Sequence, residues 1–215
     1  MKIISLEGLK GAGKTSIAEE LGRRRNIDIC EKYMHQHIAL SSMLFSLKKR
    51  YENKFLNIDE ALGTYYYASF FSSLEKAING GRTAIVLDKG LLSLPATGYY
   101  GYLKNKETLP FSKYSRILFE TFELAIIHYN SIKADSYFFI IKCNEEERLR
   151  RIMSREEIKP SELIAVGRND IYELIFSQSA LLAQARLSRA SFHYLFNENL
   201  EDKRKAISSI EALVL

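Results

Sequence analysis

The sequence predicts an α/β fold in which helices cover both faces of a parallel sheet. Short apolar runs alternate with longer segments of helical periodicity, which is the pattern of parallel strands joined by crossover helices. The runs are continuously apolar, as expected for strands that are buried on both faces. A glycine-rich loop separates the first apolar run from the first helical segment. The length of 215 residues favours one domain, 1–215.

The strands are predicted from apolar runs bounded by polar or turn residues. The first run leads directly into the glycine-rich loop, and the runs that contain "TAIVL" and "YFFII" are the most apolar. In chain order the expected strands are Lys2 to Leu6, Ile27 to Cys30, Thr83 to Leu87, Tyr137 to Lys142 and Phe192 to Phe196.

The helices are predicted from apolar residues at helical spacing and from the residues that typically start or end a helix. "NGG" ends the second helix, Pro110 and Ser112 precede or cap the third, and Ile207 and Ile210 belong to the buried stripe of the last. The expected helices are Lys14 to Arg25, Ile58 to Asn79, Phe111 to Lys133, Glu145 to Arg155, Ser161 to Arg189 and Leu200 to Leu213.

The composition is that of a globular protein without a membrane span. Hydrophobic residues make up 47% of the chain, enough for one sizeable core, yet no apolar run approaches the roughly 18 residues of a membrane span. The apolar run at the start is too short for a signal peptide. Cys30 and Cys143 are far apart, which argues against a disulfide framework or a zinc site. We therefore expect a cytoplasmic protein that does not bind membranes.

The charge balance suggests an anionic partner. The net charge is +5 and the pI is about 9.0. The basic clusters lie on predicted helices with acidic residues close by, so solvated helix faces explain most of them. A groove for nucleic acid is therefore only weakly supported, and the charge alone does not identify the anionic partner.

The strongest motif is "GLKGAGKT", Gly8 to Thr15, which matches GxxxxGK[ST] in full. Its glycines allow backbone angles that aim successive amide hydrogens inward, so that they surround a polyphosphate. Lys14 would reach the outer phosphates, and the Thr15 hydroxyl would ligate Mg²⁺. A purely structural glycine turn is the alternative. The residues expected to bind ATP here are Gly8, Lys10, Gly11, Ala12, Gly13, Lys14, Thr15 and Ser16.

Four segments resemble thymidylate kinases and the related deoxynucleoside kinases. The glycine loop with its flanks, "ISLEGLKGAGKTSIAEEL", is similar to the opening of that family, and "NGGRTAIVLDKGLLS" is similar to the segment with its Asp-Arg or Glu-Arg pair. "YFFIIKCNEEERLRRIMSREE" resembles the fourth strand and the arginine-bearing lid, and "FHYLFNENLEDKRKAISSIEALV" resembles the last strand and helix. Together they cover most of the chain.

This resemblance implies a three-layer P-loop NTPase fold, with a five-stranded parallel sheet and helices on both faces. It implies transfer of the terminal phosphoryl group of ATP, with Mg²⁺, to a nucleoside or nucleoside monophosphate, and a lid at about residues 145–160. The helices at 58–79 and 111–133 have apolar faces that would serve a homodimer, as in the resembled family, or cover the sheet.

Two carboxylates follow predicted strands, where ligands bind in parallel sheets. Asp88 can hold Mg²⁺ or orient the attacking oxygen, although strand ends and helix caps often carry Asp. Glu31 corresponds to the family's base toward a sugar hydroxyl, but a surface role explains it equally well. Lys89 stands where the family has arginine and is expected to act in catalysis and substrate binding. Ser93 matches the family's serine five residues after the acid.

Arg148, Arg151 and Arg155 have spacings that place them on one face of a helix. A mobile lid with arginines stabilises transferring charge in kinases, so catalysis is expected of Arg151 and Arg155 and ATP binding of Arg148. The alternative is charge pairing with the neighbouring glutamates.

The aromatic runs "YYYASFF" and "TGYYGY" lie where the family builds its base pocket. Tyr66, Phe70 or Tyr100 could sandwich a nucleobase, although an aromatic stripe of this kind is more often core. His35 and His37 lack a third ligand at recognisable spacing, which argues against a metal site.

The sequence departs from the thymidylate kinase pattern at four positions that handle the acceptor. Lys10 stands near the position of an acid in the family's glycine loop, and Cys30, Ser69 and Lys89 replace arginines. Lysine supplies charge without bidentate geometry, so the identity of the phosphoryl acceptor is left open. A kinase of a nucleoside or another small hydroxyl compound is the first alternative. A nucleotide-binding or nucleic-acid-associated protein without turnover is the second.

Overall fold

The structure is a computed structural model that describes residues 1–25, 28–30, 70–72, 74–81, 83–96, 111–155, 158 and 169–214. In addition to the named elements, residues 70–72, 74–79 and 93–96 are helical. The elements are β1 (Lys2–Glu7), α1 (Lys14–Arg25), β2 (Asp28–Cys30), β3 (Ala84–Asp88), α5 (Phe111–Ser131), β4 (Asp135–Lys142), α6 (Glu145–Met153), α8 (Asn169–Arg186), β5 (Ala190–Phe196) and α9 (Leu200–Val214).

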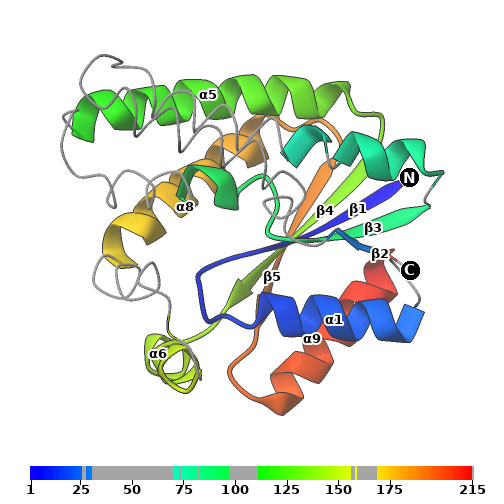
Figure 1. Ribbon diagram of the computed structural model, residues 1–215, viewed down its shortest axis with the longest axis vertical. Helices are drawn as coiled ribbons and strands as arrows, with labels where there is room; N and C mark the ends of the chain where they lie inside the picture. The colour runs from blue at the N-terminus through cyan, green and yellow to red at the C-terminus, as the bar shows by residue number, and fades with distance from the viewer. Residues whose placement is uncertain are drawn as a thin grey trace, which may run out of the picture.

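The strands form one parallel sheet in the order β2-β3-β1-β4-β5. At the centre, Ile4 of β1 lies between Val86 of β3 and Tyr137 of β4. Helices α5 and α8 lie on one side of the sheet, and α1 and α9 lie on the other (Figure 1). The predicted α/β class, with helices on both faces of a parallel sheet, is confirmed.

Two hydrophobic cores fill the space between the sheet and the two helix layers. Alternate residues of β1 belong to different cores, because successive side chains of a strand point to opposite faces. Ile3 packs in the core beneath α5 and α8, whereas Ile4 and Leu6 pack in the core beneath α1 and α9. Every one of these three side chains is 0% exposed, as expected for a strand covered on both faces.

Several elements differ from their predicted bounds by a few residues. Strands β4 and β5 begin two residues earlier than predicted, at Asp135 and Ala190, because backbone pairing between them extends beyond the apolar runs. Helix α6 ends at Met153, so the predicted continuation to Arg155 is wrong. Helix α5 ends at Ser131, two residues before the predicted end.

The "NGG" sequence ends its helix as predicted. The amide of Gly81 donates to the carbonyl of Ile78 at 3.1 Å, and Gly81 has a φ of +72°. Glycine adopts this left-handed conformation at little cost, which is why it terminates helices so often. The chain then enters β3.

The carboxyl ends of the parallel strands meet at one edge of the sheet. Leu6 of β1 is in register with Asp88 of β3, and Glu7 is in register with Ile140 of β4. The glycine loop follows β1 at this edge, and α6 follows β4 (Figure 1). In open parallel sheets ligands bind at this edge.

Within the described residues, no helix has the length and apolar character needed to cross a membrane.

We expect Phe138→Ala to destabilise the fold strongly. Phe138 of β4 is 0% exposed, and its ring stacks on that of Phe192 with centroids 4.9 Å apart. Truncation of a buried Phe typically costs about 3–5 kcal/mol. Urea denaturation would measure the loss, with Leu124→Ala as control, because Leu124 is 67% exposed and its loss should cost about 0.5 kcal/mol or less. Equal losses in the two variants would contradict the packing described.

Candidate active site

The glycine loop between β1 and α1 is tightly enclosed by its neighbours. Gly11 and Gly13 have φ angles of +83° and +85°, a conformation that other residues adopt only under strain. A Cβ on Gly11 would lie 2.7 Å from the carbonyl oxygen of Arg148, and one on Gly13 would lie 2.2 Å from Nδ2 of Asn197. Glycine is therefore required at both positions for conformation and for space.

Lys14, the first residue of α1, is the buried cation of the site. It is 6% exposed, and its Nζ donates to the carbonyl oxygens of Gly8 and Leu9, each at 2.8 Å. Burial, and then the nearby charge of Lys89, lower the pKa of Lys14 to about 8, whereas Asp88 and Glu7 act in the opposite direction. The ammonium group therefore lies inside the loop, where an anion would be expected to bind.

Thr15 and Asp88, the two predicted metal ligands, are in direct contact. The Thr15 hydroxyl donates to Oδ2 of Asp88 at 2.6 Å. Asp88 is 6% exposed, and its buried Oδ1 has no hydrogen-bond partner among the described residues. Mg²⁺ prefers oxygen ligands of this kind. The two residues thus fit a magnesium site. It is not a cluster of His, Cys, Asp or Glu side chains, since the described residues contain no group of three that could hold a metal.

Two further loop residues have contacts that the sequence did not predict. The Ser16 hydroxyl donates back to the carbonyl of Gly13 at 2.9 Å. The carbonyl of Ala12 accepts from Nδ2 of Asn197 at 2.7 Å, and Asn197 is 3% exposed. Asn197 was not among the site residues predicted from the sequence. Its position directly after the last strand, at the edge where ligands bind, was the feature that could have revealed it.

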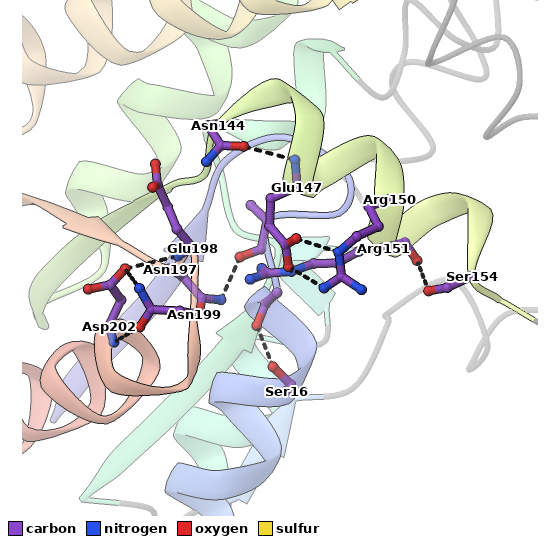
Figure 2. A network of polar contacts seen from close by, with 12 residues as sticks. Ser16, Asn144, Glu147, Arg150, Arg151, Ser154, Asn197, Glu198, Asn199 and Asp202 are labelled. Atoms are coloured by element: carbon purple, nitrogen blue, oxygen red, sulfur yellow. Dashed lines mark hydrogen bonds and ion pairs between the residues drawn. The ribbon is translucent and has the colours of Figure 1, made fainter.

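Helix α6 carries an ordered charge network (Figure 2). Asn144 caps the helix by accepting from the amide of Glu147 at 2.8 Å. The Glu147 carboxylate accepts from Arg150 and from Nε of Arg151 at 2.6 to 2.7 Å. The hydrogen bond from Arg150, and to a smaller extent that from Arg151, lowers the pKa of Glu147 to about 2. The alternative that the sequence left open, pairing with glutamates, therefore occurs at Arg151, and Arg148 also lies 3.7 Å from Glu145.

The three predicted arginines occupy different environments. Arg148 is 1% exposed, and its Nη1 donates to the carbonyl of Lys10 at 3.3 Å. It therefore supports the backbone of the glycine loop. Arg151 is partly buried, and its Nη1 would lie 3.3 Å from a Cβ on Gly13. Arg155 lies beyond the end of α6 and is exposed. The predicted common helical face thus holds only as far as Arg151.

The turn after β3 carries Lys89 and Ser93. Lys89 has a φ of +86° and is the one non-glycine residue in the described part of the chain with a positive φ. Ser93 is 1% exposed, and its hydroxyl donates to the buried carboxyl of Glu7. Glu7 was not among the residues that sequence analysis selected for the site. A carboxyl at the end of an apolar strand, directly before the glycine loop, was the available signal.

The remaining candidates divide between the core and regions that are not described. Phe70 is 1% exposed and packs edge-on against Phe71, with centroids 5.1 Å apart, which is the core alternative that the sequence left open. Glu31, Tyr66 and Tyr100 lie outside the described residues, as do Ser69, His35 and His37.

The parallel sheet with a glycine loop after β1 defines the class of fold found in P-loop kinases of the thymidylate kinase and deoxynucleoside kinase type. Deoxyadenosine kinase from M. mycoides with bound dATP is similar with a TM-score of 0.60 and 18% identity, covering 99% of this chain and 98% of that chain. Thymidylate kinase from Candida albicans has a TM-score of 0.56 and 14% identity, covering 98% and 91%. Thymidylate kinase from Ehrlichia chaffeensis has a TM-score of 0.53 and 14% identity, covering 100% and 98%.

No protein-family model matches this sequence, and no curated protein matches it. At identities of 14 to 18%, the structural likeness shows the fold alone. The resemblance inferred from the sequence motifs is confirmed at this level.

We expect the buried Lys14 to leave a signature in the pH dependence of stability. Its pKa is lower in the folded protein, about 8, than its ordinary value of 10.5, so the unfolded chain binds more protons between these values. Stability should therefore rise with pH in this window, by up to a few kcal/mol. Lys14→Met removes the group, so the difference in unfolding free energy between wild type and variant should change between pH 8 and 10.5.

Urea denaturation at several pH values measures this difference. Lys76→Met is the matched control, because Lys76 is an exposed helical lysine and its removal should give a difference that changes little with pH. A Lys14→Met profile parallel to that of wild type would contradict the buried ammonium.

Proposed function

We propose that this protein is a kinase that transfers the terminal phosphoryl group of ATP to a nucleoside monophosphate, with Mg²⁺. The observation that carries the proposal is the convergence of Lys14, Thr15 and Asp88. A buried ammonium lies within the glycine loop, and the next residue contacts a buried carboxylate with a free oxygen at the same sheet edge. Phosphoryl transfer depends on such positioning and on electrostatic stabilisation, rather than on covalent chemistry by the protein.

On the donor side, the loop amides and the amino end of α1 would bind the phosphates of ATP. Lys14 would exchange its two carbonyl partners for phosphate oxygens, which satisfy an ammonium group better because they are charged. Ser16 lies in the first turn of α1, and Lys10 and Ala12 line the same loop. Arg148 would contribute by holding the carbonyl of Lys10.

In the transfer step, an oxygen of the acceptor attacks the γ-phosphorus. The bond from this phosphorus to the β-γ bridging oxygen breaks, and ADP leaves with the electron pair. Negative charge spreads over the three γ-oxygens, where Lys14 would stabilise it. Arg151 is the next nearest candidate for this role, since it lies beside Gly13, and Arg155 would have to approach from beyond the end of α6.

Thr15 and Asp88 would hold the magnesium ion, because both offer oxygen ligands and Oδ1 of Asp88 is buried without a partner among the described residues. Bound there, Mg²⁺ would supply positive charge to the phosphates of the nucleotide.

A nucleoside acceptor is the second candidate, and the four departures from the thymidylate kinase pattern favour it. Lys89 offers a point charge in place of a bidentate guanidinium, which suits a phosphate acceptor less well. One of the structural neighbours, deoxyadenosine kinase from M. mycoides, is named as a kinase of a nucleoside. A hydroxyl acceptor must also lose a proton, and Glu31 is our candidate for the base. Tyr66 and Tyr100 remain proposed substrate-binding residues, whereas Phe70 and Ser93, which were predicted with them, are buried in the structure.

The nucleic-acid alternative gains no support from the basic helices. Arg23 and Arg24 of α1 pair with Glu20 at 2.6 and 2.9 Å, and Lys205 of α9 pairs with Glu201 at 2.6 Å. Their charges are therefore partly balanced on the helix surface, as the solvated-face interpretation expects.

We expect ATP consumption in the presence of one class of acceptor, and we expect Lys14→Ala to abolish it. Removal of a preorganised cation from the transition state should lower kcat/KM by at least about a hundredfold. The measurement is ADP release against a panel of nucleosides and nucleoside monophosphates, with circular dichroism to confirm folding. Lys142→Ala is the control, since Lys142 is an exposed lysine at the end of β4. A folded Lys14→Ala enzyme with wild-type turnover would refute the mechanism. Salt-dependent binding of single-stranded DNA or RNA, with no acceptor found, would favour the nucleic-acid alternative.

We expect Asp88→Asn to weaken the dependence of ATP binding on magnesium. The variant keeps the size of the side chain and an acceptor for Thr15, but it loses the charge that attracts the metal. Calorimetric titration of ATP, with and without Mg²⁺, should show the gain from Mg²⁺ reduced roughly tenfold. Asp135→Asn is the control, because Asp135 is an exposed carboxylate paired with Arg189 at the start of β4. An unchanged magnesium effect in Asp88→Asn would exclude this assignment.

A further inference from the structure

Glu7, the last residue of β1, has a fully buried carboxyl group, which accepts hydrogen bonds from three donors. Its Oε1 accepts from the hydroxyl of Ser5 at 2.8 Å and from the amide of Leu92 at 3.2 Å. Its Oε2 accepts from the hydroxyl of Ser93 at 2.5 Å. Glu7 is 0% exposed, so it does not form part of any surface that a nucleotide could contact. Its hydrogen bonds instead join β1 to the turn after β3.

That turn is held against β1 in a strained conformation. Lys89 has a φ of +86°, which costs a non-glycine residue on the order of 1–3 kcal/mol unless the surroundings enforce it. The amide of Lys89 donates to the carbonyl of Leu6 at 3.3 Å. A Cβ on Gly90 would overlap Oγ of Ser5, so only glycine fits where the turn passes β1. The strain is localised next to Asp88, at the candidate active site.

Glu7 also adjoins the other half of the site. The next residue is Gly8, whose carbonyl accepts from the ammonium of Lys14. Glu7 and Lys14 attract each other, since each shifts the pKa of the other in favour of its charged form. The same carboxyl therefore lies at the junction of the glycine loop and of the turn that carries Asp88 and Lys89.

We infer that Glu7 is a positioning residue, which acts through Ser93 to hold the turn at 88–93 in register with the glycine loop. Asp88 and Lys89 are thereby placed relative to Lys14 and Thr15. The inference rests on the proposed kinase function, because positioning has a catalytic consequence only if Asp88 and Lys89 act on the substrates. Ser93 is accordingly a partner of Glu7, and its effect on substrates is indirect.

The buried carboxyl of Glu7 depends on its hydrogen-bond partners. Burial raises the pKa of Glu7 above its ordinary value, although the Ser93, Ser5 and Leu92 hydrogen bonds oppose this effect. A raised pKa means that stability contributed by the protonated group is lost as the pH rises above the ordinary value of 4.5. The hydrogen bonds and the charge of Lys14 oppose the effect of burial, so the partners of Glu7 in β1, the turn and the glycine loop are what allow a carboxyl at this place.

The test compares two serines that each donate one hydrogen bond to Glu7. Ser93→Ala removes the side-chain to side-chain hydrogen bond between the turn and β1, and Ser5→Ala removes a bond within β1 while leaving the Leu92 and Ser93 bonds intact. We expect Ser93→Ala to lower kcat by roughly tenfold or more, because small misplacements of catalytic groups have effects of this size. The KM for ATP should change little. Ser5→Ala should keep kcat within about twofold of wild type.

Substitutions of Glu7 itself separate geometry from folding. Glu7→Ala leaves the donors of both serines and of Leu92 without their acceptor, so it should lose activity at least as severely as Ser93→Ala. Glu7→Gln offers an oxygen to Ser5 and Leu92 and an amide to the Ser93 oxygen, so it should restore most of kcat. Should Glu7→Ala fail to fold, the comparison of Ser93→Ala with Ser5→Ala still decides the matter.

Hydrogen-deuterium exchange of residues 88–93 gives a readout that is independent of activity. Uptake should rise in Ser93→Ala and stay at the wild-type level in Ser5→Ala. A folded Ser93→Ala protein with wild-type kcat and wild-type exchange would overturn the inference, as would equal loss of kcat in both serine variants. If the wild-type enzyme phosphorylates no acceptor, the kinase proposal fails. The exchange data then decide the positioning role alone: raised uptake supports it, and unchanged uptake overturns it.

Discussion

The buried ammonium group of Lys14 is the interaction on which the rest of this site depends. A cation enclosed by protein loses its hydration, and it persists only where hydrogen bonds and opposite charges replace water. Here the carbonyls of Gly8 and Leu9 accept its protons, and the carboxyls of Asp88 and Glu7 favour its charged state. The pKa nevertheless falls to about 8, so these groups compensate only in part. A bound polyphosphate would complete the compensation, because it brings several negative charges into the same space.

Close packing around the glycine loop connects this cation to distant parts of the chain. Arg148 of α6 lies against Gly11, and Asn197, which follows β5, lies against Gly13 and holds the carbonyl of Ala12. These contacts leave no room for side chains at Gly11 and Gly13, so the loop consists of backbone alone at these two positions. Elements from the second half of the sequence therefore determine the shape of a loop near its beginning. A change in α6 or after β5 would reach the loop without touching a ligand.

The sequence predicted the fold well because the relevant information was local. Continuous apolar runs identify buried parallel strands, and the GxxxxGK[ST] pattern encodes its own loop geometry. Lys14, Thr15 and Asp88, which were selected for the site, lie together in the structure, and their roles stay predictions. The misses concern side chains whose role depends on tertiary contacts. Glu7 and Asn197 are ordinary residues in the sequence, and only the meeting of strand ends gives them partners. Helix α6 was extended to Arg155 because charge spacing continues past Met153, whereas the backbone ends the helix there. Glu31, Tyr66 and Tyr100 stay predictions.

The two lysines that replace family residues now have a physical context. Lys10 and Lys89 both lower the pKa of Lys14, and Arg148 adds a further buried cation beneath the loop. Against these four basic residues stand the carboxyls of Glu7 and Asp88, together with Glu145, which lies 3.7 Å from Arg148. Around the loop, basic residues therefore outnumber acidic ones. Such an excess favours anions at the loop, and it does so without the bidentate geometry that would distinguish a monophosphate acceptor. The charge around the loop thus suits the donor phosphates of the proposed function, and it does not by itself select an acceptor.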